Sequence, residues 1–316
     1  MPRRYHVIVN ARSGTALGMD VSPEALRQHF SDDLPEADIF IDSDVDEPLS
    51  ERVERAKDSD AEIIVAAGGD GTVTAVASAI ADTDKTLAIM PLGTANTLAR
   101  DLGVPLDLKL WGAAIEAMKP QRIDVGDVNG RIFLHNVVAG LIPGIVAGRE
   151  QIRGSNVFGA RLALARFVLR RLFRTRRMAV EITDKSGQPQ IKRVVAVAVG
   201  NNQFDEALGR FLARQRIDNG SLGVYLLKHL TPTDLVRLVF EMLIGNWKQD
   251  EAIEVDTVEG LTLRTRKQTL KVMLDGELEL LQVPLKFRIR PLALSVLAAT
   301  PPPPAPAEDA AALAAG

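Results

Sequence analysis

The sequence contains no cysteine, which excludes disulfide bonds and thiolate metal sites and fits a reducing compartment. It has no uninterrupted apolar run of about 18 residues, the length that a membrane-spanning helix needs. Its first residues lack the apolar core of a signal peptide. The formal net charge of −3 leaves no basic excess to neutralise nucleic-acid phosphates. We therefore expect a soluble, cytoplasmic protein that binds no nucleic acid, and its 316 residues allow two domains.

The most informative feature that is present is the glycine-rich loop Gly68-Gly69-Asp70-Gly71-Thr72, which lies between an apolar strand pattern and a helical pattern. Glycines let the backbone approach a ligand closely, and a helix N-terminus offers free N–H groups, so the pattern predicts a phosphate site. The charge of Asp70 would repel a phosphate unless a metal ion or a proton lay between them. We expect a nucleotide–Mg²⁺ site with Asp70 directed at the metal or at the attacking hydroxyl. The alternative is a structural turn in which Asp70 caps the helix.

The first part of the chain alternates strand and helix patterns, which is typical of βαβ units around a parallel sheet. Ligands bind at the carboxyl ends of the strands in such sheets. Three small polar loops follow strands and should meet at that edge: residues 10–14, 68–72 and 92–96. The expected strands are 6–10, 37–41, 61–67 and 86–91, and the expected helices are 23–30, 48–57, 73–81, 94–101 and 106–118.

From residue 122 onward strand patterns dominate, with hairpin-type turns at Asn129-Gly130 and Asp275-Gly276 and two helices at 160–176 and 231–244. We expect an antiparallel β-rich domain, residues 122–290, that packs on the α/β domain, residues 1–121, with a cleft between them. The Pro- and Ala-rich residues 300–316 cannot bury much surface and are expected to form a disordered tail. Among the expected strands are 131–139, 192–200 and 285–289.

The glycine-rich loop belongs to a series of short motifs that follow one another in a fixed order. In the first half they are residues 7–14, 68–72 and 91–96, and in the second half Ile123-Asp124-Val125-Gly126, residues 133–136 before Gly140, Asp218-Asn219-Gly220 and Leu274-Asp275-Gly276-Glu277. In order and spacing the series resembles the diacylglycerol kinase catalytic domain. It is most similar to the soluble bacterial lipid kinases, which in turn are similar to sphingosine and ceramide kinases.

The resemblance implies a NAD kinase/diacylglycerol kinase-like fold and ATP-dependent phosphorylation of a lipid hydroxyl with Mg²⁺. It implies that ATP and lipid meet in the cleft and that residues 291–298 return to the first domain. No Gly-x-x-x-x-Gly-Lys-Ser/Thr motif occurs, so backbone amides, the metal and Arg12 must balance the phosphate charge. The candidate nucleotide-binding residues are Asn10, Arg12, Ser13, Gly14, Gly68, Gly69, Gly71, Thr72, Gly93, Thr94 and Asn96.

Three carboxylates are the candidates for catalysis: Asp70, Asp124 and Glu277. The resemblance gives Asp70 a role in metal organisation or base catalysis, and Glu277 the role of proton acceptor. Asp124 falls at the domain junction, where the acceptor should enter. The alternatives are a strand-end cap for Asp124 and a solvent-facing hairpin position for Glu277. Which of the three is the general base stays open.

The sequence departs from the family pattern at three places. Thr97 follows Asn96 where the family often has an aspartate, and Leu141 follows Gly140 where another is common. Asn219 replaces one of two aspartates at a metal site of some members, so Asp218 is only a weak candidate Mg²⁺ ligand. These departures affect acceptor specificity first, and they leave open a catalytically idle nucleotide-binding module. A NAD kinase-like enzyme is the other alternative, because that group shares the Gly-Gly-Asp-Gly-Thr loop.

Residues 161–177 suggest contact with a membrane. Arginines recur there at helical spacing on one face, at 166, 170, 174 and 177, and apolar residues fall largely on the other face. A basic amphipathic helix suits an anionic membrane surface at the inner face of the membrane. The alternative is a helix that packs on the core with a solvated basic face. The sequence leaves open a homodimer and does not identify the acceptor lipid.

Overall fold

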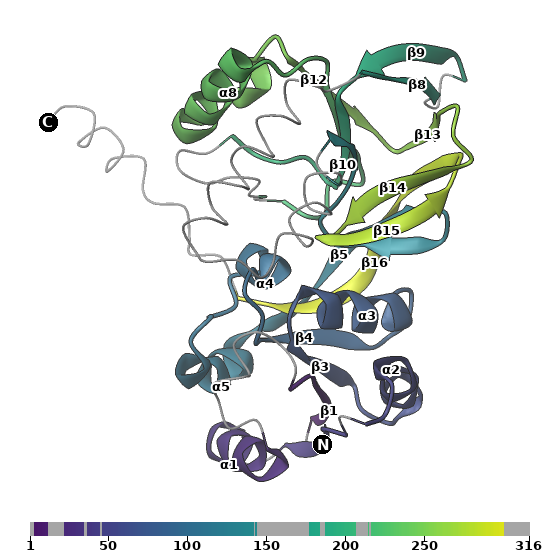
Figure 1. The fold of residues 1–316 in the computed structure, drawn as a ribbon. Coiled ribbons are helices and arrows are strands. Elements are labelled where there is room, and N and C mark those ends of the chain that lie inside the picture. Colours follow the sequence, from purple (N-terminus) through teal and green to yellow (C-terminus); the bar gives the residue numbers. More distant parts are fainter. Residues whose placement is uncertain are drawn as a thin grey trace, which may run out of the picture.

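The computed structural model describes residues 3–11, 22–34, 37–44, 46–141, 143, 177–183, 187–206, 214 and 216–299. The strands of these residues form a ten-stranded sheet, which runs through both halves of the molecule, and a six-stranded sheet in the second half (Figure 1). The expected helix at 160–176 and the expected tail at 300–316 lie outside the described residues. No helix within the described ranges is long and apolar enough to cross a membrane.

The first half is an α/β layer structure, as predicted. Its strands are parallel in the order β2-β1-β3-β4, and β3 and β4 are buried at every position because helices cover both faces. Figure 1 shows α1 and α5 on one side of the sheet and α2 and α3 on the other. These elements are β1 (Arg4–Val9), α1 (Pro23–Asp33), β2 (Asp38–Asp42), α2 (Leu49–Asp58), β3 (Ile63–Gly68), α3 (Asp70–Ile80), β4 (Thr86–Pro91), α4 (Thr97–Asp101) and α5 (Leu108–Ala117).

The last strand, β16 (Leu285–Ala298), joins the two halves of the ten-stranded sheet and is far longer than the five residues expected. Its end pairs in parallel with β4 through Ser295 and Val296, and its start pairs antiparallel with β13. The sheet continues from β13 (Gly260–Arg264) through β8 (Met178–Thr183) to β9 (Pro189–Val194). Residues 291–298 therefore lie in the sheet of the first half, and the domain boundaries at 121 and 290 stay a prediction.

Asp124 fixes the point where β16 passes from one half to the other. It lies on β5 (Lys119–Val128), which pairs with β16 along most of its length, with a register shift between Arg290 and Leu294. The fully buried Asp124 carboxylate accepts a hydrogen bond from the N–H of Leu292 in that irregularity (2.9 Å) and one from the N–H of Gly220 (2.6 Å). A buried carboxylate is tolerated only when it is hydrogen-bonded. Asp124 thus has a structural role inside β5 rather than the strand-end cap that the sequence left as its alternative, and its catalytic role stays a prediction.

The second sheet is antiparallel in the order β12-β11-β10-β7-β14-β15, as the strand-rich second half predicts. The β14–β15 hairpin turns at Asp275-Gly276, where both residues have positive φ. The strands and the remaining helix are β6 (Arg131–Phe133), β7 (Asn136–Gly140), β10 (Ala196–Asn201), β11 (Leu222–Leu227), α8 (Pro232–Ile244), β12 (Ile253–Val258), β14 (Thr269–Leu274) and β15 (Glu277–Gln282).

Two strands predicted as continuous are each divided between the two sheets, so these predictions were wrong. Residues 131–139 form β6 in the first sheet and β7 in the second, and residues 192–200 divide in the same way into β9 and β10. Between β6 and β7 the backbone N–H groups of residues 134–136 donate to a side chain, the Asp275 carboxylate, instead of a neighbouring strand. An apolar pattern shows that a segment is buried but not which partner binds its backbone.

A buried ionic cluster at the edge of the first sheet makes stability depend on pH. Asp42 accepts hydrogen bonds from Arg52 Nε (2.6 Å) and Arg55 Nη2 (2.6 Å), and the buried His6 places its Nε2 atom 3.6 Å from Asp42 Oδ2. Burial lowers the pKa of His6, against the opposite effect of Asp42. The folded protein therefore resists protonation of this imidazole.

We expect the free energy of unfolding to fall as the pH drops below about 6.5, the pKa of His6 in the unfolded chain. In that range the unfolded state takes up a proton that the folded state does not bind. Urea unfolding at pH 7.5 and 5.5 should show a smaller pH-dependent loss for His6→Gln than for the wild type. Equal losses in both proteins would contradict the assignment.

Candidate functional site

Two glycine-rich loops meet at the carboxyl ends of β3 and β4. The N–H of Leu92 donates to the carbonyl of Gly68 (3.0 Å), and a Cβ atom added to Gly93 would lie only 2.6 Å from the Cα of Gly69. The two backbones therefore touch where only glycine fits. The structure brings the loops at 68–72 and 92–96 together at the edge that the sequence predicted.

Asn96 shapes the second loop from within. Its backbone is left-handed (φ +49), its Oδ1 accepts from the N–H of Gly93 (2.9 Å), and its Nδ2 donates to the carbonyl of Gly93 (2.8 Å). The side chain is buried, whereas Thr94 and Ala95 at the tip of the loop are exposed. Asn96 holds the loop closed, and Thr94 is the candidate that can reach a ligand.

Asp70 connects the two loops. Its Oδ2 accepts from the N–H of Asn96 (3.0 Å) and its Oδ1 from the N–H of Thr97 (2.7 Å), at the start of α4. Helix α3 begins at Asp70, three residues earlier than predicted, and its N-cap is Gly69. The alternative that Asp70 caps its own helix is therefore wrong, because the carboxylate binds the first N–H groups of another helix. The N–H groups of Asn96 and Thr97 carry partial positive charge at the start of α4, so they stabilise the negative charge of Asp70.

Asn10 and Thr72 stabilise the first loop by hydrogen bonds. Asn10 Nδ2 donates to Thr72 Oγ1 (2.9 Å), and the N–H of Asn10 donates to the carbonyl of Ala67 (2.8 Å). A Cβ atom on Gly68 would lie 2.4 Å from Thr72 Oγ1, so this glycine leaves the space that the threonine fills. The buried Thr72 hydroxyl thus positions the loop. Three further candidates, Arg12, Ser13 and Gly14, lie outside the described residues.

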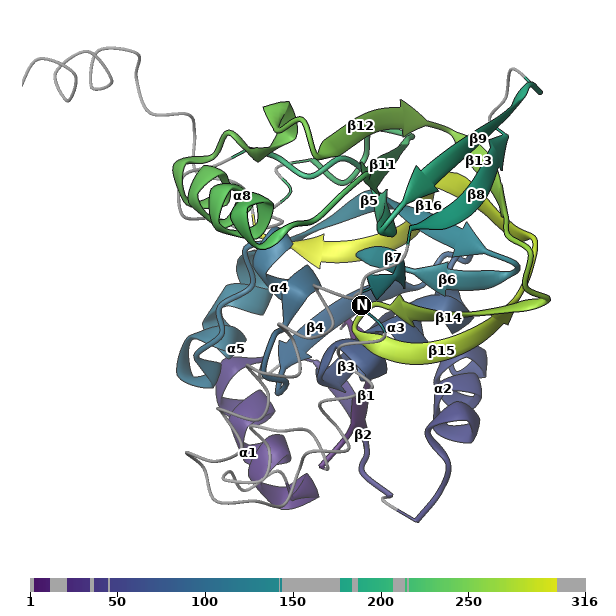
Figure 2. The ribbon, with the colours of Figure 1, turned by 45° about the horizontal axis from the view of Figure 1, so that its top comes forward.

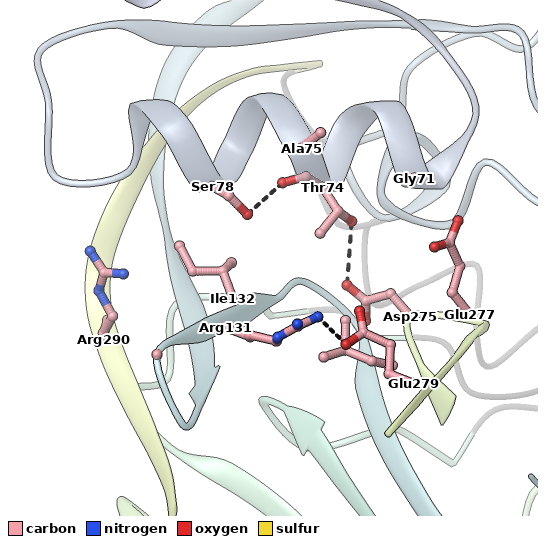
Figure 3. A pocket seen from close by; sticks show the side chains of 12 residues that line it. Gly71, Thr74, Ala75, Ser78, Arg131, Ile132, Asp275, Glu277, Glu279 and Arg290 are labelled. Carbon is pink, nitrogen blue, oxygen red and sulfur yellow. Dashed lines mark hydrogen bonds and ion pairs between the residues drawn. The ribbon is translucent and has the colours of Figure 1, made fainter. Parts of the chain in front are cut away.

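Glu277, the first residue of β15, reaches the same place from the second half. A Cβ atom on Gly71 would lie 2.9 Å from Glu277 Oε1, so the carboxylate contacts the first turn of α3. Figure 3 shows the Glu277 side chain directed toward Gly71. Glu277 is exposed, and its side chain makes no hydrogen bond or ion pair with any residue that the structure describes.

Asp275 holds this glutamate in place, and sequence reasoning missed its role. Its Oδ1 accepts from the N–H groups of His135 and Asn136 (both 2.9 Å), and its Oδ2 accepts from the N–H of Leu134 (2.7 Å) and from Thr74 Oγ1 (3.4 Å; Figure 3). Burial raises the pKa of Asp275, against the opposite effect of the three N–H groups. The Asp-Gly pair revealed the hairpin turn but not these bonds.

Two cavities flank the contact between Asp275 and Thr74, and both residues line both cavities. The larger, of about 440 Å³, lies between α3, β6 and the β14–β15 hairpin and includes Gly71 and Glu277 (Figure 3). The smaller, of about 220 Å³, includes Asp70, with apolar walls from α4 and β14. The two loops and the Glu277 carboxylate therefore border two adjacent cavities that share Thr74 and Asp275 as lining residues.

The other carboxylates named from the sequence lie elsewhere. Asp124 lines neither of these cavities, and its two oxygens accept backbone N–H groups. Asp218 forms an ion pair with Arg216 (3.1 Å). Within the described part of the chain, no three His, Cys, Asp or Glu side chains gather as a metal site.

A buried arginine, Arg214, was also missed. Its guanidinium donates to the carbonyls of Leu134 and Asn201 (both 2.7 Å) and to Asp101 Oδ2 (3.0 Å) at the end of α4. Burial raises the pKa of Asp101, against the pull of Arg214. The arginine thus ties α4 to the segment between β6 and β7, close to the smaller cavity.

Comparison with known proteins identifies the family. Residues 4–128 match the diacylglycerol kinase catalytic domain, and residues 152–298 match the YegS C-terminal NAD kinase beta sandwich-like domain. A probable lipid kinase YegS-like protein of Pseudomonas aeruginosa is 32% identical over 248 residues, which cover 74% of this chain and 75% of that protein. The chain belongs to the diacylglycerol kinase catalytic-domain family.

Two further comparisons agree with this membership. A diacylglycerol kinase of Staphylococcus epidermidis is 32% identical over 145 residues, 44% of each chain. A crystal structure of a diacylglycerol kinase from Bacillus anthracis str. Sterne has a TM-score of 0.65 and 21% identity, and the match covers 95% of this chain and 97% of that one. The likeness shows the same fold, and the family makes the chain a kinase.

We expect Asp275→Asn to lower the free energy of unfolding by about 1–3 kcal/mol. The new amide would keep one oxygen acceptor but turn N–H groups toward a backbone donor that is buried. Urea unfolding measures the loss, and Asp84→Asn, an exposed aspartate of the first half, should stay within about 0.5 kcal/mol of the wild type. Equal effects of the two substitutions would show that the Asp275 hydrogen bonds do not hold the hairpin.

Proposed function

We propose that the protein is an ATP-dependent lipid kinase that transfers the γ-phosphate to a hydroxyl of diacylglycerol or a related lipid. The observation that carries the proposal is the contact of a free carboxylate, Glu277, with the first turn of the helix that follows the glycine-rich loop. A phosphate site and a proton acceptor from the other half of the molecule thereby face the same space. The names of the relatives support a lipid as acceptor.

The nucleotide phosphates bind at the glycine-rich loops in this proposal. The first N–H groups of α3 lie at the glycine-rich loop, and glycine at positions 69 and 71 lets the nucleotide phosphates approach the backbone closely. The exposed tip at Thr94 closes the site from the neighbouring loop. Arg12, Ser13 and Gly14 keep their proposed role in phosphate binding.

The residues present fit a Mg²⁺ ion that is held jointly with the nucleotide. Each oxygen of Asp70 accepts one N–H bond in the structure, and a carboxylate has about four acceptor positions, so two remain. Mg²⁺ is commonly held by one or two carboxylates together with substrate phosphates and water. When bound there, the ion would offset phosphate charge during transfer. We assign no metal to Asp218, which is paired with Arg216.

In the reaction, the lipid hydroxyl oxygen forms a bond to the γ-phosphorus, and the bond from that phosphorus to the β–γ bridging oxygen breaks to release ADP. The hydroxyl proton passes to the Glu277 carboxylate. Such transfers depend on in-line positioning and charge stabilisation more than on covalent chemistry. Asp275 is a positioning residue, because it anchors the turn two residues before Glu277.

Transfer of labelled γ-phosphate from ATP to lipids in mixed micelles tests the proposal. We expect Glu277→Gln to lower kcat by at least about 100-fold with ATP affinity unchanged, because the side chain reaches the site from the second half. Glu279→Gln is the matched control, since the Glu279 carboxylate is already paired with Arg131 and should matter much less. Labelling of NAD in place of lipid would overturn the proposal in favour of a NAD kinase-like enzyme. ATP binding without any transfer would indicate an idle module.

Asp70→Asn should act differently from Glu277→Gln. The new amide group would turn N–H donors toward one of the two backbone donors at Asn96 and Thr97, and the contact between the loops would weaken. We expect ATP affinity to fall about tenfold, in line with the loss of one hydrogen bond to a charged group, together with kcat. Calorimetric titration with ATP and the kinase assay measure the two effects, and unchanged ATP affinity would contradict the role of Asp70 in joining the loops.

Gly71→Ala separates stability from activity. In the first turn of α3, alanine is a better helix former than glycine by up to about 1 kcal/mol, so stability should hold or rise. The new Cβ atom would lie 2.9 Å from Glu277 Oε1 and must displace that carboxylate. We expect a lower kcat at saturating ATP in the wild-type background and no further loss of kcat in a Glu277→Gln background, while hindered approach of the phosphates would raise the KM for ATP in both. Additive losses would show that the alanine acts elsewhere than through Glu277.

A further inference from the structure

The helix α8 turns an apolar face to solvent. Five of its residues are exposed large hydrophobics: Val236 (71%), Val239 (49%), Phe240 (61%), Leu243 (60%) and Ile244 (47%). Spacings of three, four and seven residues place Val236, Val239, Phe240 and Leu243 on one side of a helix, with Ile244 beside them. These five side chains are called the α8 stripe below.

The charged residues of α8 face the protein instead. Arg237 donates to both Asp250 oxygens (2.6 and 3.0 Å), and Asp234 accepts from the N–H of Thr231 (2.8 Å) and lies 3.0 Å from His229 Nδ1. Leu238 is buried on the same side. These bonds fix the rotation of the helix about its axis, so the stripe cannot turn inward without breaking them. This is the reverse of the usual surface helix, whose polar face is in water.

We propose that the α8 stripe docks on the surface of a lipid bilayer, with the helix lying in the plane of the interface. The proposal rests on the proposed function, because a kinase that phosphorylates a lipid must reach a hydroxyl at the membrane surface. Interfacial helices bury an apolar face to a depth of about 5–10 Å. A helix of 13 residues is about 20 Å long, enough to present all five side chains at that depth together.

The size and chemistry of the stripe favour a bilayer over a second copy of the chain. The stripe has five exposed residues, whereas each partner contributes about 20–30 residues to a standard protein interface. The stripe carries no charged residue and no hydrogen-bonding side chain that would set the register of a protein partner. A fluid hydrocarbon surface requires no register.

The position of α8 fits this role. Both views place it on the same side of the molecule as α4, which contributes to the smaller cavity (Figures 1 and 2). Lys248, just beyond the end of α8, holds its ammonium 5.9 Å from the centre of the Trp247 ring and has no ion pair with a described residue. This ammonium, on the residue that lies four positions beyond the end of α8, suits anionic lipid headgroups. The basic segment 161–177 lies outside the described residues, and its membrane contact stays a separate prediction.

The first test is flotation of the full chain with vesicles of phosphatidylcholine, with and without one quarter phosphatidylglycerol. We expect the wild type to bind, and the double variant Phe240→Glu/Leu243→Glu to bind at least tenfold more weakly. Ile191→Glu is the matched control, because Ile191 is equally exposed (75%) but lies on the edge strand β9, outside the stripe. It should bind as the wild type does. Wild-type binding by the double variant, or no vesicle binding by the wild type, would overturn the proposal.

A second variant keeps the test decisive if the double variant folds poorly. Phe240→Trp preserves the apolar character of the stripe and adds a fluorophore, while Trp111 and Trp247 are both buried. On vesicles its emission should shift to the blue and be quenched by lipids brominated on the acyl chain. An unchanged spectrum would overturn the proposal. So would a wild type that runs as a dimer in size-exclusion chromatography with light scattering and a double variant that runs as a monomer.

Activity measurements separate this proposal from the proposed function. With a water-soluble short-chain diacylglycerol, the double variant should phosphorylate at the wild-type rate, and with long-chain diacylglycerol in vesicles its rate should fall at least tenfold. Vesicle binding without transfer to any lipid would leave the docking surface intact and refute the lipid kinase. Transfer to lipid with equal rates for both proteins on vesicles would refute the docking surface alone.

Discussion

The arrangement of the site depends on one buried carboxylate, that of Asp275. It binds three consecutive backbone N–H groups, at Leu134, His135 and Asn136, and so interrupts the strand that would otherwise run from β6 into β7. The chain changes sheets at that point, and the β14–β15 turn is drawn against α3. Glu277 follows two residues later and therefore reaches Gly71. Without this anchor, the hairpin that carries Glu277, the proposed proton acceptor, would lose its hydrogen bonds to the segment between β6 and β7 and to α3.

The two halves of the molecule are joined more tightly than a two-domain kinase with a flexible hinge would require. Strand β16 belongs to both halves of one sheet, Asp124 holds its irregularity, and Arg214 links α4 to the segment before β7. Sliding the halves apart would break buried hydrogen bonds to charged groups, which are among the more costly to lose. The shared strand and these bonds therefore oppose a rotation of the two halves as separate rigid bodies. Asp124, a catalytic candidate by sequence, serves this rigidity.

The sequence predicted the elements of the first half and the edge at which its loops gather, because both follow from local patterns: apolar periodicity, and the position of loops after parallel strands. It also found Glu277 through a family motif. It could not predict the contacts of Asp70 with Thr97, of Asp275 with Leu134 or of Arg214 with Asn201, since each joins a side chain to the backbone of a distant segment. No residue type is required at the accepting or donating backbone, so such bonds leave no trace in composition or spacing.

The three candidate carboxylates differ in the hydrogen bonds that their side chains make. Asp70 and Asp124 each bind two backbone N–H groups, one on each oxygen, and those bonds fix both carboxylates in place. Such a carboxylate also cannot move toward a substrate without breaking these hydrogen bonds. The backbone N–H groups, which are partly or fully buried, would then have no partner. Glu277 is under neither constraint, because it is exposed and makes no bond within the described residues. The hydrogen bonds of each side chain, more than its position in a motif, therefore favour Glu277 over Asp70 and Asp124 as the proposed proton acceptor.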